Sequence, residues 1–484
     1  MVTLAACLYC RSEIHTGIIV SRIPSTVAPR NRPYCPSPTD FPHRTMNSHA
    51  LLSPTRRDAM AGWLLTLMIV ASVTPGVSLL PAGLLAWAAA LLLSYRLGWR
   101  QRVQSIWLLG FGIAGTAWGY GHGAAPDLVQ VLASNQGLVG LLAAVSFLRL
   151  VTHPEAIDRH GPLPRGRTAL WRTLLGVHLF GAVINLSTVV ILGDRMATRG
   201  RLGKRRALTL SRGFAAAAFW SPFFSAMAAA LTYAPGARLG TVVLAGLPMA
   251  AVSLWLTARD IDPENPKRGA PFVGYPMRFG ALWIPGLLVT IVLAVHAMLP
   301  HGSILAIITL SAPLLTVGIL LVQQQEAAWS PLRDHIRHGL ASTVNELTLF
   351  LAAGVLAAGL TSVTQQLNGW VPFDRFGPSQ ASLLLVGMIG LATLGVHPII
   401  TIAACGAWLA PLHPDPNLLA ITLLMAWGIG VPANPLSGLH LMMQGRYGID
   451  GYAFLRWNAG YVLKCLGVGI ALLHLYGILL GVWR

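Results

Sequence analysis

The chain has 484 residues, of which 54% are hydrophobic and only 10% are charged, and its formal net charge is +18. Apolar blocks of about 20 residues, long enough to cross the hydrocarbon core of a bilayer, recur along the sequence and exclude a soluble globular protein. The arginines lie in short loops between these blocks, where they determine topology, so the positive charge does not indicate nucleic-acid binding. The composition predicts an all-α polytopic membrane protein.

The N-terminal 57 residues differ from the rest of the chain. They are rich in Pro, Ser, Thr and Arg and show no persistent helical or strand period. This composition is typical of disordered segments. We interpret residues 1–57 as a disordered tail, or as sequence wrongly placed before a natural start at Met46.

The first half of the chain, residues 58–278, is predicted to contain six membrane spans. They cover residues 61–77, 81–93, 106–120, 136–150, 207–231 and 241–258. Basic residues recur in alternate loops, as expected of cytoplasmic loops, and they place the N-terminus inside.

Residues 168–196 do not fit a simple span. The polar stretch Asn185-Leu186-Ser187-Thr188 interrupts an apolar segment, and basic clusters lie on both sides of it. Because positive charge marks cytoplasmic loops, a single crossing should not carry it at both ends. A hairpin that enters the membrane and returns to the cytoplasmic side resolves the conflict. Non-helical backbone at that depth survives only inside protein or beside a water-filled cavity, so the tip is a candidate binding site.

The next segment, residues 207–231, holds Ser221-Pro222 at its middle. Proline inside a helix removes a backbone hydrogen bond and clashes with the preceding turn. A broken helix and a kinked span both fit this pattern.

The second half, residues 279–484, is predicted to add five spans, which brings the total to about eleven. They cover residues 279–299, 304–322, 346–364, 417–443 and 459–480 and leave the C-terminus outside. Residues 381–410 form a second hairpin, whose flanks are poor in Lys and Arg and which therefore enters from the outside. Its centre holds His397-Pro398, with Thr401 after it.

Span 417–443 is expected to unwind, because two prolines and three glycines lie close together near its middle. The residues concerned are Gly428, Gly430, Pro432, Asn434-Pro435 and Gly438. Both halves thus follow the order span, span, hairpin, broken helix, span, in opposite orientations. Inverted repeats with discontinuous helices point to a binding site near the membrane midplane of a secondary transporter. The N-terminal ends of half-helices suit an anion, and their C-terminal carbonyls suit Na⁺ or a proton carrier.

At the level of topology, about residues 60–484 resemble the divalent anion/sodium symporter family of the ion transporter superfamily. That family carries Ser-Asn-Thr at each hairpin tip, which contacts a carboxylate substrate and helps to bind Na⁺. The resemblance implies a homodimer, Na⁺ as a coupling ion, and a site that includes both tips and both broken helices. The implied site residues are Asn185, Ser187, Thr188, Ser221, His397, Thr401, Asn434 and Ser437.

We therefore expect a secondary active transporter in a bacterial-type cytoplasmic membrane that moves a small, carboxylate-like anion with H⁺ or Na⁺. No catalytic site, metal site, cofactor or nucleic-acid partner is expected. The alternatives are an integral-membrane transferase and a permease-like subunit of a larger complex. A transferase would need acidic or metal-binding residues on long outer loops, and the outer loops here are short, with scattered Asp127, Asp374 and Asp415.

Three polar residues allow two interpretations each. Asn185 is either a ligand of the solute or an interhelical packing residue. His397 is either a proton-coupled or anion-contacting residue, or a neutral histidine that satisfies the backbone of its tip. Glu346, the acidic residue nearest to a membrane segment, is either a proton site or a charge at the N-terminus of a helix.

Overall fold

The computed structural model describes most of the chain after the N-terminal tail. The described residues are 54–74, 78–125, 127–152, 164–197, 200–261, 271–275, 277, 279–299, 302–367 and 369–482. The tail predicted at residues 1–57 lies almost wholly outside them. Within the described residues the chain is all-helical, as predicted, and the sole strand-like feature there is an isolated bridge between Arg165 and Val273.

The first half contains ten α-helices within its described ranges. They are α2 (Pro54–Val73), α3 (Leu80–Leu93), α4 (Trp99–Gly121), α5 (Leu128–Ala133), α6 (Gln136–Ser146), α7 (Gly166–Ile184), α8 (Ser187–Met196), α9 (Lys204–Ala216), α10 (Ser225–Tyr233) and α11 (Leu239–Ile261).

The described part of the second half contains nine α-helices, and short 3₁₀ and π segments join α13, α14 and α15. They are α12 (Trp283–Met298), α13 (Ile304–Gln324), α14 (Trp329–Asp334), α15 (Val344–Gln366), α16 (Pro378–Thr393), α17 (Pro398–Leu409), α18 (Pro416–Ala433), α19 (Gly438–Tyr447) and α20 (Gly451–Leu479).

Five helical stretches among the described residues are long and apolar enough to cross a membrane. They are Val131–Leu150, Leu239–Ile261, Ile304–Gln366, Pro416–Tyr447 and Gly451–Leu479. Three of them expose large apolar side chains, such as Leu244, Val322 and Leu463. Because water disfavours such exposure and lipid does not, these helices indicate a membrane-embedded protein. The count of eleven spans stays a prediction.

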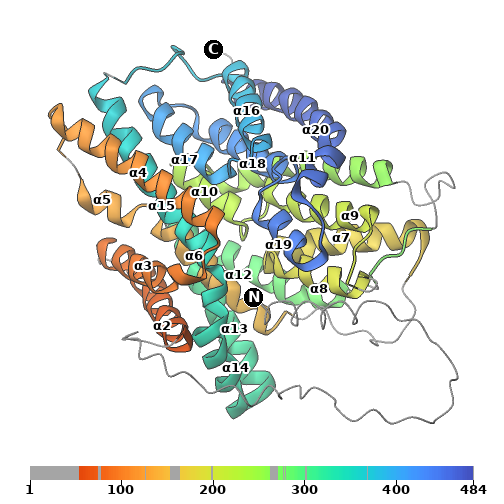
Figure 1. Ribbon diagram of the computed structural model, residues 1–484. Helices are drawn as coiled ribbons and strands as arrows, with labels where there is room; N and C mark the ends of the chain where they lie inside the picture. The colour runs from red at the N-terminus through yellow and green to blue at the C-terminus, as the bar shows by residue number, and fades with distance from the viewer. Residues whose placement is uncertain are drawn as a thin grey trace, which may run out of the picture. The chain divides into compact units, whose positions relative to one another are not determined.

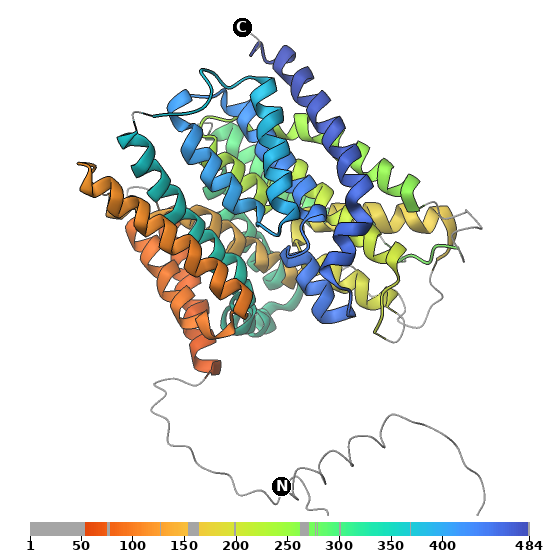
Figure 2. The same ribbon diagram turned by 45° about the horizontal axis from the view of Figure 1, so that its top comes forward.

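Helices α4 and α15 lie side by side (Figures 1 and 2). Gly112 of α4 approaches Val355 of α15, and further along both helices Gly119 approaches Ser362. The two helices therefore run in the same direction. A Cβ atom on Gly112 would lie 2.5 Å from the carbonyl oxygen of Val355. Small residues at this seam therefore let the two backbones touch, as is common between membrane helices.

Helix α18 is the most enclosed of the candidate spans. Every residue from Asn417 to Ala433 is buried, and α9, α10, α11, α16 and α20 all pack against the helix. Figure 2 shows α20, the long dark-blue helix, running close to α16 on one side of this core.

The helix also continues through Gly428, Gly430 and Pro432, so the expectation that it unwinds at these residues was wrong. Gly428 instead packs directly against the ring of Phe219, and a Cβ atom there would overlap that ring. Pro432 lies inside the helix one residue before its end, so the helix tolerates the loss of one backbone hydrogen bond there and stops directly afterwards.

Candidate functional site

The first hairpin tip and the first helix break are joined by one buried serine. Helix α7 ends at Ile184, Asn185 takes a positive φ of 57°, and α8 begins at Ser187. The chain is non-helical between Phe219 and Ser225, the stretch that holds Ser221 and Pro222. The hydroxyl of Ser221 donates to the carbonyl oxygen of Ala182 at 2.5 Å and accepts from the N–H of Phe223 at 3.2 Å.

The second tip and break repeat this arrangement with an asparagine. Helix α16 is followed by Gly395 at φ +95°, and the non-helical chain between α18 and α19 starts at Asn434. The Asn434 side chain donates to the carbonyl oxygen of Val396 at 2.9 Å and accepts from the N–H of Leu436 at 2.7 Å. In both halves the residue at the break thus donates to a carbonyl oxygen at or just before the tip, Ala182 in the last turn of α7 and Val396 after α16, and accepts from the backbone N–H two residues ahead.

Two of the other predicted site residues, Thr401 and Ser437, bond to nearby backbone. The Thr401 hydroxyl donates to the carbonyl oxygen of Pro398 at 2.9 Å, and Ser437 caps α19 by accepting from the N–H of His440 at 3.3 Å. At the first tip, Asn185 and Ser187 are half-buried. The hydroxyl of Thr188 is fully buried and has no hydrogen-bond partner among the described residues. It is the clearest unsatisfied polar group at either tip.

A cavity of about 580 Å³ lies beside the second tip and the second break. Its wall combines α4, the first half of α15, the tip at Leu394–Ile400 and the start of α19. The polar or charged side chains of the lining include Arg100, Gln104, Asn345, Glu346 and His397, and Trp107 contributes a large aromatic ring. Of the eight predicted site residues, His397 lines this cavity and the other seven do not.

His397 acts at the tip through one ring nitrogen and leaves the other one free. Its Nδ1 atom accepts a hydrogen bond from the N–H of Ile399 at 3.2 Å, and so it caps α17. This bond assigns the proton of the neutral ring to Nε2, which has no hydrogen-bond partner among the described residues. The ring packs edge-on against Trp427, with centroids 5.5 Å apart. His397 therefore satisfies the backbone and can still donate a hydrogen bond to a ligand.

The charged groups of the cavity come from the two parallel helices. Arg100 lies on the first turn of α4, and Glu346 on the first turn of α15. Oε1 of Glu346 is 4.0 Å from the position that a Cβ atom would take on Gly438, the first residue of α19. Beside it, Oδ1 of Asn345 is buried without a hydrogen-bond partner in the described part of the chain. An isolated carboxylate and an unsatisfied amide thus lie at the entrance to α19.

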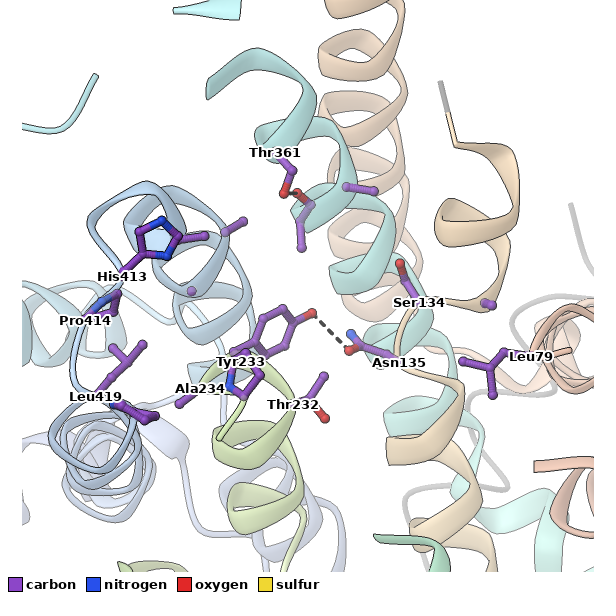
Figure 3. Close-up of a pocket in the computed structure, with 18 residues that line it drawn as sticks. Leu79, Ser134, Asn135, Thr232, Tyr233, Ala234, Thr361, His413, Pro414 and Leu419 are labelled. Carbon is purple, nitrogen blue, oxygen red and sulfur yellow. Dashed lines mark hydrogen bonds between the residues drawn. The ribbon is translucent and has the colours of Figure 1, made fainter. Parts of the chain in front are cut away.

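A second cavity, of about 740 Å³, lies beside the second half of α15, at Ala357, Ala358 and Thr361 (Figure 3). The Tyr233 hydroxyl, at the end of α10, donates to Oδ1 of Asn135 at 3.0 Å. Asn135, which has φ +61°, donates in turn to the carbonyl oxygen of Phe350 at 2.8 Å. Thr361 of α15 and His413, which follows α17, line the opposite part of the cavity. The two cavities therefore lie along successive parts of α15, the first from Asn345 to Leu356 and the second from Ala357 to Thr361.

Sequence reasoning missed a buried charge network centred on Arg212 of α9. The guanidinium is 2% exposed, and it donates to Asp260 at 2.9 Å and to Asn458 at 2.8 Å. Lys464 shares the same carboxylate at 3.1 Å. Asn458 donates to the carbonyl oxygen of Pro432, so the network reaches the end of α18. An arginine inside an apolar block was the available signal, since charges within membrane segments almost always have partners.

His440 provides a second link between α9 and the second break. Its Nδ1–H donates to the carbonyl oxygen of Asn434 at 2.8 Å, which leaves Nε2 to accept from the hydroxyl of Ser211 at 2.9 Å. The ring stacks on Phe454, with centroids 4.0 Å apart. The histidine is fully buried, so its contacts serve packing between the two halves of the chain.

Within the described residues, no group of three or more His, Cys, Asp or Glu side chains is arranged to hold a metal ion. A scan against protein-family models gave no match, and no curated protein sequence is significantly similar to the chain.

Proposed function

We propose that this protein is a secondary active transporter that moves a small, carboxylate-like anion across a bacterial-type cytoplasmic membrane, coupled to H⁺ or Na⁺. The proposal includes about eleven spans, re-entrant hairpins at 168–196 and 381–410, an inside N-terminus, an outside C-terminus and a homodimer. The observation that carries it is the repeated attachment of a break to a tip, by Ser221 in one half and Asn434 in the other. Paired discontinuous helices of this kind are typical of secondary transporters.

The cavity beside the second tip suits an anion. Arg100 supplies a positive charge, and His397 supplies a free N–H donor. The N-terminal ends of α17 and α19 also meet its wall, at His397 and Gly438. Because the first N–H groups of a helix lack intrahelical partners and carry partial positive charge, both ends favour a carboxylate.

The positions of the two cavities support transport rather than simple binding. One cavity is lined by Asn345, Glu346, Leu349 and Leu356 of α15, and the other is lined by Ala357, Ala358 and Thr361 further along the same helix. A transporter needs a site that becomes accessible from each side in turn, and two cavities that follow one another along one helix are consistent with that need. The bond between Tyr233 and Asn135 spans the second of these cavities.

Uptake into proteoliposomes tests the proposal. The purified protein is reconstituted, and uptake of labelled acetate, succinate and citrate is measured under imposed pH and Na⁺ gradients. We expect at least one gradient to drive accumulation of at least one of these carboxylates. Failure of both gradients to drive uptake of all three acids, by protein that is folded and inserted, would contradict the proposed function.

A single-residue variant locates the site. His397→Asn keeps a side-chain acceptor for the α17 cap but withdraws the N–H donor from the cavity. Loss of a hydrogen bond to a charged ligand is expected to reduce uptake roughly tenfold or more. His338→Ala is the matched control, because His338 is half-exposed and lies outside the cavity. Equal uptake by the two variants would remove His397 from the site.

A further inference from the structure

Glu346 is the one acidic residue among the described residues that line the cavity beside the second tip. Its carboxylate is half-buried and forms no ion pair or hydrogen bond with another described residue. Asp58, Asp194 and Asp260 differ, because each binds an arginine. A carboxylate near apolar surroundings that lacks a fixed cation has a strong reason to take up a proton.

The charged and titratable groups that face Glu346 are few. Arg100 of α4 and His397 of the second tip line the same cavity as Glu346. Helices α3, α5 and α6, which also pack against α15, contain no charged residue, and neither does α17. The described lining of this cavity therefore contains one carboxyl group, on Glu346, and one permanent cation, on Arg100, with no ion pair between them.

The place of Glu346 links its proton to the anion. Its Oε1 atom lies 4.0 Å from the Cβ position of Gly438, where α19 begins and where the proposed anion would bind. An ionised carboxylate there neutralises the positive helix end and repels a second negative charge. At about 5 Å and an effective dielectric constant of about 20, that repulsion weakens anion binding roughly a hundredfold or more. Addition of a proton to the carboxylate removes the repulsion.

We propose that Glu346 carries the coupling proton, so that the anion binds when Glu346 is protonated and the two are taken up and released together. This inference rests on the proposed function and narrows its coupling ion to H⁺. No covalent bond to the anion forms or breaks: the proton binds a carboxylate oxygen of Glu346 on one side of the membrane and returns to water on the other.

The first test compares charge-neutral variants in proteoliposomes that contain a pH-sensitive dye. With wild-type protein, addition of the transported carboxylate from the panel above is expected to acidify the lumen, and an inward proton gradient is expected to accelerate uptake. Glu346→Gln is expected to abolish both effects while exchange of labelled for unlabelled anion persists. Glu326→Gln, which changes an exposed carboxylate outside the cavity, is expected to behave as wild type.

Two results of that test would overturn the inference. One is lumen acidification by Glu346→Gln at the wild-type ratio of protons to anions. The other is the reverse pattern, in which Glu346→Gln keeps the full wild-type response to the proton gradient and His397→Asn loses it. That pattern would assign the proton to the histidine. We expect His397→Asn to reduce the rate of uptake but to retain its acceleration by the proton gradient.

The second test needs no transported substrate and therefore separates this inference from the proposed function. Dicyclohexylcarbodiimide modifies protonated carboxyl groups in apolar surroundings, and mass spectrometry identifies the modified peptide. Modification of Glu346 in the wild-type protein is expected to increase as the pH is lowered from about 9 to about 5, a range that spans protonation of carboxyl groups in apolar sites. If the panel of carboxylates is not transported but this labelling is observed, the transport proposal fails and proton uptake by Glu346 stands. Modification that is absent or independent of pH would refute the inference.

Discussion

The tie between the second hairpin tip and the second helix break depends on Asn434, and replacing this residue measures what the tie contributes. Asn434 is fully buried, and its amide makes one hydrogen bond in each direction. Asn434→Leu keeps most of the side-chain volume but leaves the carbonyl of Val396 and the N–H of Leu436 without partners. Both groups belong to interrupted backbone, so no neighbouring helix turn can replace the lost bonds.

The expected magnitude follows from the two unsatisfied groups. Each buried polar group left unpaired costs about 1–3 kcal/mol, so Asn434→Leu is expected to lower the free energy of unfolding by about 2–6 kcal/mol. Asn434→Asp keeps the acceptor for Leu436 but loses the donor to Val396 and adds a buried charge. We therefore expect both variants to be less stable than wild type.

Reversible unfolding in mixed micelles with increasing sodium dodecyl sulfate provides the measurement. Ser221→Ala, which removes the matching pair of hydrogen bonds in the first half, is the companion variant and by the same reasoning is expected to lose about 2–6 kcal/mol. Substitutions at unimportant surface positions change the free energy of unfolding by no more than about 0.5 kcal/mol. If the values for Asn434→Leu and Ser221→Ala both lie that close to wild type, the repeated hydrogen bonds do not stabilise the fold as we infer.

Three further predictions concern other contacts. Gly112→Leu is expected to prevent the close approach of α4 to Val355 and to reduce the yield of folded protein, measured by size-exclusion chromatography, whereas Gly110→Leu, which has open space, is expected to be tolerated. Arg212→Met is expected to cost about 3 kcal/mol in the same unfolding assay, because it leaves buried partners unpaired. The hydrogen bonds from Arg446 lower the pKa of the Asp194 carboxyl group. The ion pair therefore stabilises the folded protein above about pH 4, and this stabilisation disappears as the pH falls through the lowered pKa. Asp194→Asn should therefore lower the free energy of unfolding by less than about 1 kcal/mol at pH 7 and leave it unchanged at low pH, in the same unfolding assay. An equal loss of stability at both pH values would argue against a contribution from the ion pair.

The positions of the helix interruptions could be read from the sequence because their causes are local. Pro222 and Asn434-Pro435 stand where the chain leaves helical conformation, and the polar residue at the first tip, Asn185, takes a positive φ. Asparagine tolerates this conformation better than most residues, and proline cannot continue a helix. Gly428 shows the limit of such reasoning. A glycine inside a helix can also make room for an aromatic ring of a neighbouring segment, here that of Phe219, and the sequence does not reveal which residue that is.

The contacts of the candidate site could not be predicted, since they join residues far apart in the chain. Arg212 finds its partners on α11 and α20, and Glu346 meets the start of α19. The apolar pattern predicts that each helix is buried but not which helix covers it. For the same reason His397 could be chosen from its place beside Pro398, whereas the role of Arg100 in the same cavity depends on the pairing of α4 with α15.

The glycine seam between α4 and α15 limits how the cavity beside the second tip can change its shape. One wall consists of these two helices, whose backbones are already in contact at Gly112 and Val355, so they cannot approach further and are costly to separate. The facing wall consists of the tip at Leu394–Ile400 and the start of α19, and a hydrogen bond from Asn434 joins the tip to the break before α19. In the proposed transporter, we therefore expect the opening and closing of this cavity to come from movement of the facing wall, while α4 and α15 keep their mutual distance.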